Sequence, residues 1–479
     1  MKENARLGAQ IRALRRQQGL TQAKMAERLG ISASYLNLIE HGRRPLTAEL
    51  LIKLAQSFHV DLKTFGGEDQ TRLLADLLEA CGDPLFDPYA LSTDDLRSLA
   101  ENTPSAARAM LGLYRAFQGA TESARSLAER VSEEAADLSG GMTLFRQPSE
   151  EVSDLVQKHR NYFPELEEGA ERIRRDARLE REDLFQGLAR FLLEAHGVEV
   201  RIEKVGAMRR AVRRFDPSRR ELLLSEVLRR GSRNFQLAYQ VSMLTERRTI
   251  ERLGDEPTLT TPDSRALGRV VLANYCAAAV LMPYEPFLQA AQEERYDIEL
   301  LGHRFRTSFE QVCHRLTTLR RPQSEGVPFH LVRVDAAGNI SKRFSASGIR
   351  IARFSGACPR WILHSAFLTP GMFRRQVSRM PDGTRYFSFS RTIEKESAGF
   401  HGPHAAHAIE LGCPIEHARE LVYSDGVDLA NLTAAVPVGV TCRLCERMDC
   451  EQRVFPALQN PLRVDENVRG ISFYAPVQD

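Results

Sequence analysis

The stretch L-T-Q-A-K-M-A-E-R-L-G-I-S-A-S-Y-L-N-L-I-E-H-G-R-R, residues 20–44, decides how the first domain folds. Two helix signals flank Gly30, which can supply the positive φ of a tight turn between helices. Thr21 and Ser32 stand at N-cap positions, because each hydroxyl can accept a backbone N–H that a helix leaves unbonded. The positions that a helix pair would bury are apolar: Ala26, Leu29, Ile31, Leu36 and Ile39. The stretch therefore predicts a helix-turn-helix, whose second helix lies in the major groove of DNA.

The residues around this stretch extend the prediction to a domain over residues 1–66. A helix over residues 7–18 and another that begins after Thr47 belong to the same module, which we expect to contain five helices. Residues 1–65 carry eleven Lys and Arg against five Asp and Glu, whereas the net charge of the whole chain is only +3. A basic module on a slightly acidic body is typical of a DNA-binding protein. The module resembles the Xre/Cro/C1 class of phage-repressor-like domains over its full length.

The helix-turn-helix pattern assigns roles to individual side chains. Gln22, Ser34, Tyr35 and Asn37 are expected to face base edges, and the arginines are expected to contact phosphates. The predicted DNA-binding residues are Arg12, Thr21, Gln22, Ser32, Ser34, Tyr35, Asn37, Arg43 and Arg44. Because such domains usually act as dimers, we expect a homodimer or higher homo-oligomer on a near-palindromic site in double-stranded DNA, with half-sites about 34 Å apart.

The composition of the 479-residue chain limits the possible classes of protein. Its length allows two to four domains, and an apolar fraction of 43% with a charged fraction of 27% is ordinary for a globular protein. No run of eighteen apolar residues occurs and the start lacks a hydrophobic signal region, so we expect a cytoplasmic protein without membrane contact. Eight cysteines in so long a chain suggest metal or redox chemistry rather than a disulfide framework.

Helical segments dominate the middle of the chain. Residues 67–147 predict a helical linker or dimerisation region, with a long helix from Ser105 to about Leu138 whose sparse apolar stripe fits a dimer seam or a solvated connector equally well. Residues 148–322 predict an α+β domain with three helices, three short strands and a long helix from Gly231 to about Arg252.

The second of these regions resembles the ImmA/IrrE metallopeptidase domain. The stretches R-N-F-Q-L-A-Y-Q-V-S-M and A-N-Y-C-A-A-A-V-L-M-P carry the resemblance. Such enzymes hold zinc with an H-E-x-x-H motif, but the matching positions here are Tyr239, Gln240 and Met243. A neutral phenol and a thioether are poor zinc ligands, and an amide cannot act as the general base. We therefore expect no enzymatic activity and a pocket that binds a small molecule instead.

Residues 323–479 predict a second α+β domain that begins with short alternating strands. A segment rich in Arg, Gly and Ser follows, and it ends at the single tryptophan, Trp361. Forked guanidinium groups suit phosphates and an aromatic face suits a base, so this segment is a candidate ligand site. A solvated basic edge beside a core tryptophan is slightly favoured by residue types alone. The predicted ligand-binding residues are Tyr239, Met243, Arg343, Arg350, Arg353, Arg360 and Trp361.

The end of the chain holds clustered cysteines. Cys442, Cys445 and Cys450 form a C-x2-C-x4-C pattern, and Cys413 precedes them in L-G-C-P. Four thiolates at such spacing fit either structural zinc or an iron–sulfur cluster. The four remaining cysteines, at positions 81, 276, 313 and 358, are scattered and are interpreted as small packing residues.

Taken together, the chain resembles the short-chain fatty acyl regulator family, which includes mycobacterial regulators of propionate and glyoxylate metabolism. The match rests on R-V-D-A-A-G-N at 333–339, S-K-R-F-S-A-S-G at 341–348, A-C-P-R-W at 357–361, L-V-Y-S-D-G at 421–426 and C-R-L-C at 442–445. The resemblance implies a transcription factor that senses an acyl-CoA and carries a 4Fe-4S cluster on Cys413, Cys442, Cys445 and Cys450. The alternatives are a redox or metal sensor without an acyl-CoA effector and a peptidase-type regulator. The expected fold is mainly α with α+β parts.

Overall fold

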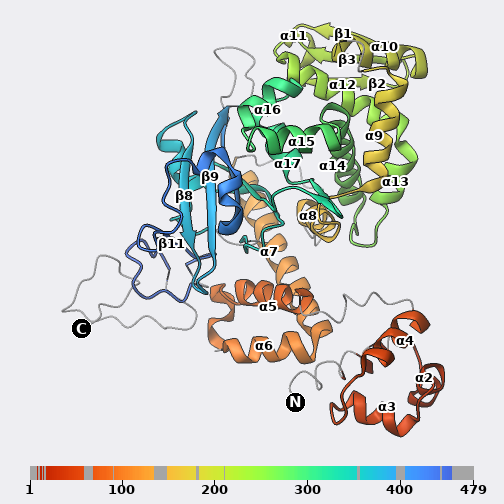
Figure 1. The fold of residues 1–479 in the computed structure, drawn as a ribbon, viewed down its shortest axis with the longest axis vertical. Helices are drawn as coiled ribbons and strands as arrows, with labels where there is room; N and C mark the ends of the chain where they lie inside the picture. Colours follow the sequence, from red (N-terminus) through yellow and green to blue (C-terminus); the bar gives the residue numbers. More distant parts are fainter. Residues whose placement is uncertain are drawn as a thin grey trace. The chain divides into compact units, whose positions relative to one another are not determined.

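The protein is described by a computed structural model that covers residues 8, 11–12, 14–15, 18–58, 68–89, 91–133, 148–179, 183–209, 211–352, 357–394, 405–442 and 445–455 (Figure 1). Contacts divide the chain into two compact units, one of residues 1–144 with 457–461 and one of residues 145–456 with 462–479. The first unit holds the helix-turn-helix and a set of three helices. The second unit combines a helical region with a six-stranded sheet.

The helix-turn-helix is formed by α2 (Gln22–Leu29) and α3 (Ala33–Glu40), and α4 (Ala48–Phe58) packs beside them. Thr21 Oγ1 accepts the backbone N–H of Lys24, and Ser32 Oγ accepts that of Tyr35, as N-caps do. Gly30 has a φ of 69°, a left-handed conformation that glycine adopts without strain. Of the predicted five helices, the described residues contain these three and helical positions at 8, 11, 12, 14 and 15.

The rest of the first unit is a set of three packed helices, α5 (Glu68–Ala80), α6 (Thr93–Asn102) and α7 (Pro104–Glu133), with the short 3-10 helix η2 (Pro84–Tyr89) after α5. A capping box between Ser92 and Asp95 starts α6. Their shared core is formed by Leu73, Leu77, Leu96, Ala107, Leu111 and Tyr114. The predicted alternative of a solvated connector is therefore wrong for the first half of α7, which packs against α5 and α6.

The helical region of the second unit surrounds a small three-stranded sheet. The first helices are α8 (Pro148–Lys158), α9 (Pro164–Asp176) and α10 (Leu184–His196), and the strands are β1 (Glu199–Glu203), β2 (Arg213–Asp216) and β3 (Glu221–Ser225), with α11 (Val205–Met208) between β1 and β2. The sheet order is β1-β3-β2, with β1 parallel and β2 antiparallel to β3.

A run of helices then completes this region. These are α12 (Arg230–Thr245), α13 (Arg247–Gly254), α14 (Pro262–Leu281), α15 (Tyr284–Glu293), α16 (Ile298–Phe305) and α17 (Phe309–Leu316). The predicted long helix from Gly231 is two helices, because the backbone breaks at Glu246, which is buried and accepts a hydrogen bond from Arg172.

The six-stranded sheet has the order β11-β8-β9-β10-β6-β7. Its strands are β6 (His330–Asp335), β7 (Ile340–Ser345), β8 (Arg374–Arg379), β9 (Arg385–Glu394), β10 (Ala406–Pro414) and β11 (Val436–Pro437), and a two-residue pair, β4 (Arg320–Arg321) and β5 (Ser324–Glu325), precedes it. Short helices α18 (Ile362–Ser365), η3 (Ala366–Leu368), η4 (Ile415–Glu420) and η5 (Val422–Ser424) fill the connections.

The sheet joins the helical region through one continuous core. Leu331, Phe387, Phe389, Ile409 and Leu411 point from one face of the sheet into the same cluster as the side chains of α9, α12 and α14. The opposite face is covered by α18 and its flanks in a smaller cluster. The predicted regions 148–322 and 323–479 are thus packed together. In the described part of the chain no single helix has the length and hydropathy to cross a bilayer, and only the bent pair of α14 and α15 meets those criteria.

Candidate DNA interface, ligand cavity and cysteine site

The recognition helix α3 presents a polar exposed face. Ser34 and Asn37 are exposed, Tyr35 is half-buried against the domain core, and Arg43 and Arg44 lie exposed after the helix. The hydroxyls of Thr21 and Ser32 are engaged in the caps, so these two residues position the helices rather than present a free side chain.

A buried carboxylate that sequence reasoning missed organises this face. Glu40 is 2% exposed, and Arg15 holds it with a two-pronged ion pair of 2.6 and 3.1 Å. Gln22 donates to Glu40 at 2.8 Å and to the side chain of Asn37 at 3.3 Å, so the predicted base-facing pair is tied to this carboxylate. Burial opposes ionisation of Glu40, but the hydrogen bonds from Arg15 and Gln22 outweigh it and lower its pKa. Arg12 donates to the Glu40 carbonyl at 2.7 Å, so its guanidinium is already engaged within the domain.

A cavity of about 1920 Å³ lies in the second unit, between the helical region and the edge of the large sheet. Its wall is built by α8, the start of α12, one side of α14, α17 with its preceding loop, β7 and the end of β9. Residues as far apart as Ser149 and Glu394 line it. No local sequence motif could have revealed this cavity, because its wall is assembled from separate elements of the fold.

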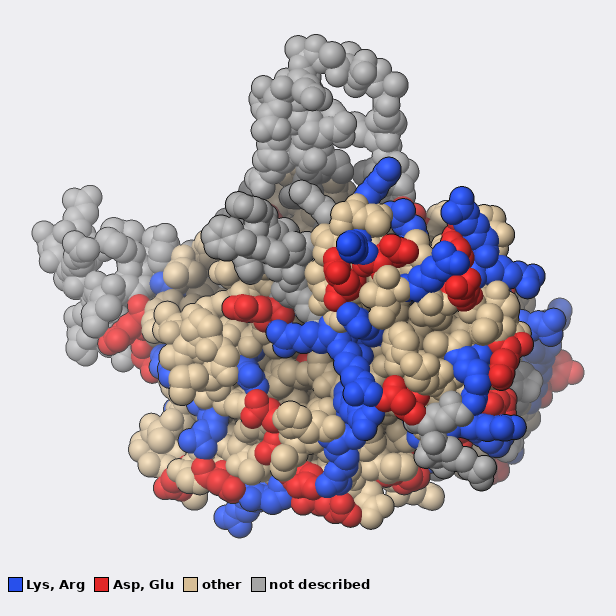
Figure 2. All heavy atoms as spheres, turned by 90° about the horizontal axis from the view of Figure 1, so that it is seen from above, with Lys and Arg blue, Asp and Glu red and all other residues tan. Residues whose placement is uncertain are grey.

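The cavity wall carries many basic side chains. The cationic and imidazole side chains on the wall are Arg229, Arg230, His303, Arg306, His314, Lys342, Arg343 and Arg391. Carboxylates hold several of these cations: Arg306 meets Asp183 at 3.2 Å, Lys342 meets Glu310 at 3.6 Å, and Arg391 meets Glu299 at 2.6 Å. Figure 2 shows the same intermingling on one face of the molecule, where a band of Lys and Arg runs beside Asp and Glu.

The cavity wall also carries apolar side chains. They are Val212 just before β2, Leu228 just before α12, Phe235 on α12, and Leu267, Val270 and Val271 on α14. Val212 is 43% and Val270 is 39% exposed, so large aliphatic side chains remain open to the cavity. The cavity thus offers forked cations and an apolar surface to one ligand.

The helix α8 joins the cavity to the sheet. Glu150 on α8 pairs with Arg343 on β7, and both side chains line the cavity. Two turns further along, Gln157 exchanges two hydrogen bonds with the backbone of Ser345, at 2.8 and 3.3 Å. The Glu150 carboxylate therefore already pairs with one cation of the cavity wall, Arg343. Glu150 lies on α8, the helix that follows residues 134–147.

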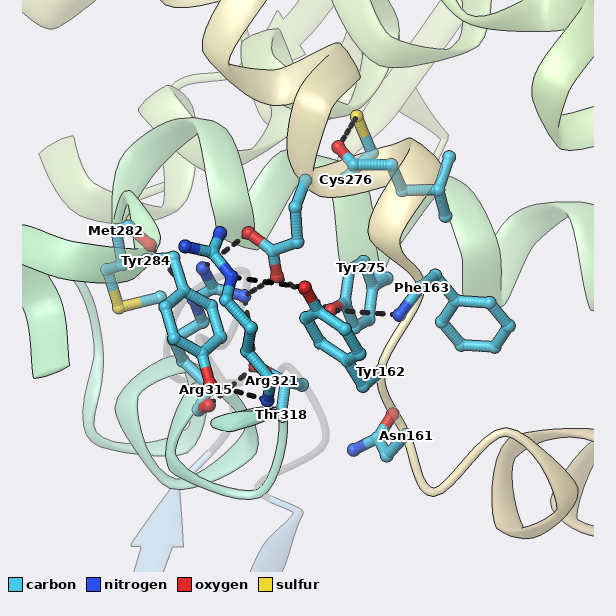
Figure 3. A network of polar contacts seen from close by, with 12 residues as sticks. Asn161, Tyr162, Phe163, Tyr275, Cys276, Met282, Tyr284, Arg315, Thr318 and Arg321 are labelled. Atoms are coloured by element: carbon cyan, nitrogen blue, oxygen red, sulfur yellow. Dashed lines mark hydrogen bonds and ion pairs between the residues drawn. The ribbon is translucent and has the colours of Figure 1, made fainter. Parts of the chain in front are cut away.

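The floor of the cavity is a buried polar network (Figure 3). Arg315 is fully buried and donates to both oxygens of Glu167, at 2.6 and 2.9 Å, and to the carbonyl of Met282 at 2.9 Å. Tyr275 donates to the same carboxylate at 2.6 Å and accepts the backbone N–H of Phe163. Burial, followed by the charge of Glu167, raises the pKa of Tyr275 well above its usual range. The network fixes α9, α14 and α17 relative to one another.

The positions of the absent zinc motif form no part of this cavity. Tyr239 and Gln240 are buried, Met243 is half-buried in the core, and none of the three lines the cavity. The Arg213 guanidinium lies 3.6 Å above the centre of the Tyr239 ring. A half-buried cation thus stacks on the residue that replaces the first histidine of the motif. The predicted acyl contact near Tyr239 and Met243 does not coincide with the cavity.

The predicted arginine and tryptophan segment is also dispersed. Of its described members only Arg343 lines the cavity, Arg350 is exposed elsewhere, and Arg360 is half-buried. Trp361 is 3% exposed in the core beneath α18, where its indole N–H donates to the carbonyl of Gly439 at 2.9 Å. The prediction that Trp361 offers a stacking face therefore needs correction, because the ring is enclosed by protein. Arg353 lies outside the described residues.

The fold brings together a different set of cysteines from the one that the sequence predicted. Cys413 is fully buried in β10, within the large core and opposite Phe387, and burial followed by Glu420 and Glu416 raises its thiol pKa. Cys358, in contrast, lies close enough to Cys442 and Cys445 to interact electrostatically with both, and its backbone N–H donates to Val440 at 3.0 Å. Cys445 interacts in the same way with Cys450.

Arg453 organises the cysteine loop. It is 4% exposed, and its guanidinium donates to the carbonyls of Cys442 at 2.6 Å and Cys445 at 2.7 Å. Burial raises the pKa of the Cys445 thiol, whereas a backbone hydrogen bond and the charges of Arg453 and Arg447 favour the thiolate. Within the described ranges, no three His, Cys, Asp or Glu side chains already have metal-binding geometry. The donor set of Cys358, Cys442, Cys445 and Cys450 fits a thiolate-bound metal or cluster better than a set with Cys413.

Three known families match consecutive parts of the chain. Residues 11–65 match a helix-turn-helix family, residues 193–317 match the IrrE N-terminal-like domain, and residues 318–474 match the C-terminal domain of short-chain fatty acyl coenzyme A regulators.

Similar proteins extend over the full length. A propionyl-CoA carboxylase regulator of Cereibacter sphaeroides is 41% identical over 98% of both chains. The HTH-type transcriptional regulator RamB of Mycobacterium tuberculosis is 38% identical over 98% of both chains, and PrpR of the same organism is 37% identical over 96% of this chain and 93% of its own. A solved Mycobacterium tuberculosis transcriptional regulator, 40% identical, covers 68% of this chain and 99% of its own with a TM-score of 0.65. The chain belongs to the short-chain fatty acyl coenzyme A regulator family.

Proposed function

We propose that the protein is a transcription factor that binds DNA through α3 and changes its DNA affinity when a short-chain acyl-CoA fills the cavity. The observation that carries the proposal is the mixed composition of the cavity wall, which combines cations with aliphatic side chains. Coenzyme A carries three phosphates and an adenine, and a short acyl chain is small and apolar. Forked guanidinium groups bind phosphate oxygens in pairs, and an apolar wall takes the acyl group.

The expected arrangement of the ligand follows from the two kinds of side chain on the wall. Lys342 and Arg343 on β7, with Arg306 before α17, are our candidates for the phosphate contacts. The acyl group would lie against Phe235, Val270 and their apolar neighbours. Such a surface discriminates each methylene by about 1–3 kcal/mol, so related short acyl-CoAs should compete within one or two orders of magnitude.

Calorimetric titration with acetyl-, propionyl- and butyryl-CoA tests the ligand assignment. Lys342→Ala is expected to weaken binding of all three about tenfold or more, because it removes one phosphate contact from each. Arg350→Ala is the matched control, since Arg350 is an exposed arginine off the cavity wall. Binding no tighter than millimolar, or equal losses in both variants, would contradict the cavity as the acyl-CoA site.

The same ligand suggests how the signal reaches the DNA-binding domain. A phosphate that binds Arg343 would compete with Glu150, and Glu150 lies on the helix that follows the connection from α7. A ligand shifts an equilibrium only through different affinities for two states, and release of Glu150 provides that difference. Occupied and empty cavities would therefore differ in how firmly α8 is held to β7.

For the cysteines we propose a 4Fe-4S cluster held by Cys358, Cys442, Cys445 and Cys450, with zinc as the alternative. The grouping of four thiols on loops, near Arg447 and Arg453, supports a negatively charged centre there. A cluster would supply thiolate-to-iron charge transfer and sensitivity to oxygen. Anaerobically purified protein should be brown. Cys358→Ser should lose the colour, and Cys413→Ser should keep it. Colourless protein with one equivalent of zinc, lost only in Cys358→Ser, would favour the alternative.

The DNA-binding role is tested at single residues. Asn37→Ala is expected to cost about 1–3 kcal/mol at one base position and to relax selectivity there. Arg43→Ala should weaken binding to all sequences alike and reduce the salt dependence, as loss of a phosphate contact does. Binding to a randomised DNA library at two salt concentrations separates the two behaviours. An unchanged sequence preference in Asn37→Ala would contradict its contact with a base.

A further inference from the structure

One face of α14 lines the cavity, and a single amide interrupts its apolar surface. Most of the wall residues of this helix are three or four positions apart, so their side chains share one face. These residues are Leu267, Val270, Val271, Asn274, Tyr275 and Ala278. The Tyr275 hydroxyl already donates to Glu167 in the floor of the cavity, so Asn274 carries the remaining polar side chain of this face.

The Asn274 amide is half-buried next to aliphatic side chains. Within the residues that the structure describes, it makes no hydrogen bond. Val270 and Val271 lie one turn before it on the same face, and Val271 packs against Val152 and Leu155 of α8. An amide offers two N–H donors and one carbonyl acceptor. Because a polar group without a partner is unfavourable beside carbon, this amide is suited to bind a polar ligand atom there.

We infer that the Asn274 amide donates a hydrogen bond to the thioester carbonyl of the acyl-CoA, and that the cavity thereby distinguishes acylated from free coenzyme A. This inference rests on the proposed function, in which the acyl chain lies against Phe235 and Val270. Val270 is one helical turn from Asn274, and the thioester oxygen of a short acyl chain is only a few bonds from its methyl end. Free coenzyme A has the same phosphates and the same adenine but lacks this oxygen.

A second amide on the wall, Gln236 of the neighbouring helix α12, is the competing candidate. It is also half-buried and makes no hydrogen bond within the described part of the chain. Its neighbours on the wall are Ser232, one turn earlier, and the basic pair of Arg229 and Arg230 where α12 begins. These neighbours suit the polar part of the ligand, whereas Asn274 follows aliphatic side chains. Asn274 is therefore the amide that meets the acyl end.

Two ligands that differ only at the carbonyl test this contact. Propionyl-CoA carries the thioester oxygen, and its thioether analogue S-propyl-CoA has a methylene group in place of the carbonyl. Calorimetry of the full-length wild type should show about tenfold tighter binding of propionyl-CoA, which corresponds to one hydrogen bond. Asn274→Leu keeps the approximate size of the side chain but removes its donors, so this variant should bind the two ligands about equally.

Two further variants make the result specific. Gln236→Leu is the matched control and should keep the preference for propionyl-CoA. Asn274→Asp replaces the donors with a carboxylate, which repels the carbonyl oxygen, so it should also lose the preference. Circular dichroism reports that each variant remains folded, and binding of S-propyl-CoA reports that its cavity is intact.

The possible outcomes separate this inference from the proposed function. Equal binding of the two ligands by the wild type, or a preference that survives Asn274→Leu, overturns the contact and leaves the proposed function standing. A preference lost in Gln236→Leu alone assigns the carbonyl to α12 and also overturns the contact. If the wild type binds neither ligand, the proposed function is wrong and this inference fails with it.

Discussion

At the scale of single residues, the buried pair of Arg315 and Glu167 has the largest expected energetic effect. The two side chains are 0% and 3% exposed, and Tyr275 completes the hydrogen bonds of the carboxylate. Removal of one partner leaves an uncompensated buried charge, which costs far more than the pair itself contributes.

We therefore expect Arg315→Met to lower the free energy of unfolding by roughly 3–5 kcal/mol. Arg252→Met breaks the pair with Glu165, whose side chains are 61% and 45% exposed, and should cost less than about 1 kcal/mol. Urea unfolding of both variants measures the difference. Equal losses would show that the buried network contributes no more than a surface ion pair.

His314 on the cavity wall should leave a signature in the pH dependence of stability. Burial and the neighbouring Lys342, opposed by Glu310, lower its pKa from 6.5 to about 4. Between pH 6.5 and pH 4 His314 takes up a proton in the unfolded chain but stays neutral in the folded chain. The free energy of unfolding should therefore fall as the pH drops from 6.5 to 4. Above pH 6.5 His314 should not contribute to the pH dependence of the free energy of unfolding. Between pH 4 and pH 6.5 the urea midpoint should depend less on pH in His314→Gln than in the wild type. An equal pH dependence would contradict the lowered pKa of His314.

Residues also show where sequence reasoning reaches its limit. Thr21, Ser32 and Gly30 were predictable as caps and turn because each acts on backbone within three residues of itself. Cys413 was chosen as a ligand because it is the nearest further cysteine along the chain, whereas Cys358 is brought close by the fold. Residue types alone slightly favoured a core tryptophan at position 361, and the structure confirms it, although the indole partner, the Gly439 carbonyl 78 residues away, could not be predicted.

At the scale of elements, α8 is the helix on which cavity and sheet meet. It lines the cavity through Glu150, Ser153 and Val156 and binds β7 through Glu150 and Gln157. Its other face carries Lys158, which pairs with Glu256 near the end of α13. The sequence predicted this helix from its apolar spacing but gave no sign of its two polar contacts with β7, which join residues almost 190 positions apart.

Glu150→Gln is expected to tighten acyl-CoA binding about tenfold, or ~1.4 kcal/mol, because the carboxylate no longer competes for Arg343. That size lies near the lower end of a hydrogen bond to a charged group. The same variant should shift the DNA affinity of the ligand-free protein toward that of the ligand-bound wild type. Calorimetry and a DNA titration measure both effects, and Lys158→Ala on the same helix should change neither. Unaltered ligand affinity in Glu150→Gln would contradict the competition.

At the scale of the whole molecule, local patterns predicted the parts and long-range packing determined the sites. The helix-turn-helix and the α+β character of the later regions follow from short-range signals and agree with the structure. The shared core of the helical region and the large sheet depends on contacts between distant residues, such as Phe163 and Phe389 in one cluster. The cavity lies where the helical region meets the large sheet, so no single stretch of the sequence could predict it.

The complete protein should protect a near-palindromic site. The two DNA-binding domains of one dimer should bind half-sites about 34 Å apart, which is one turn of the DNA helix. Footprinting of the wild type should show both half-sites. A single asymmetric half-site in the wild-type footprint would count against this arrangement.

The pair of Glu167 and Arg315 also has a consequence for the order of synthesis. The partners are 148 residues apart, so a ribosome that adds 5–20 residues per second needs about 7–30 s between them. During that interval the growing chain holds an acidic group whose counter-charge does not yet exist, and the second unit stays unfinished. The helix-turn-helix is complete within its first few dozen residues. If the second unit binds the effector as proposed, a prematurely terminated product should bind DNA without any response to that effector, which favours rapid removal of incomplete chains.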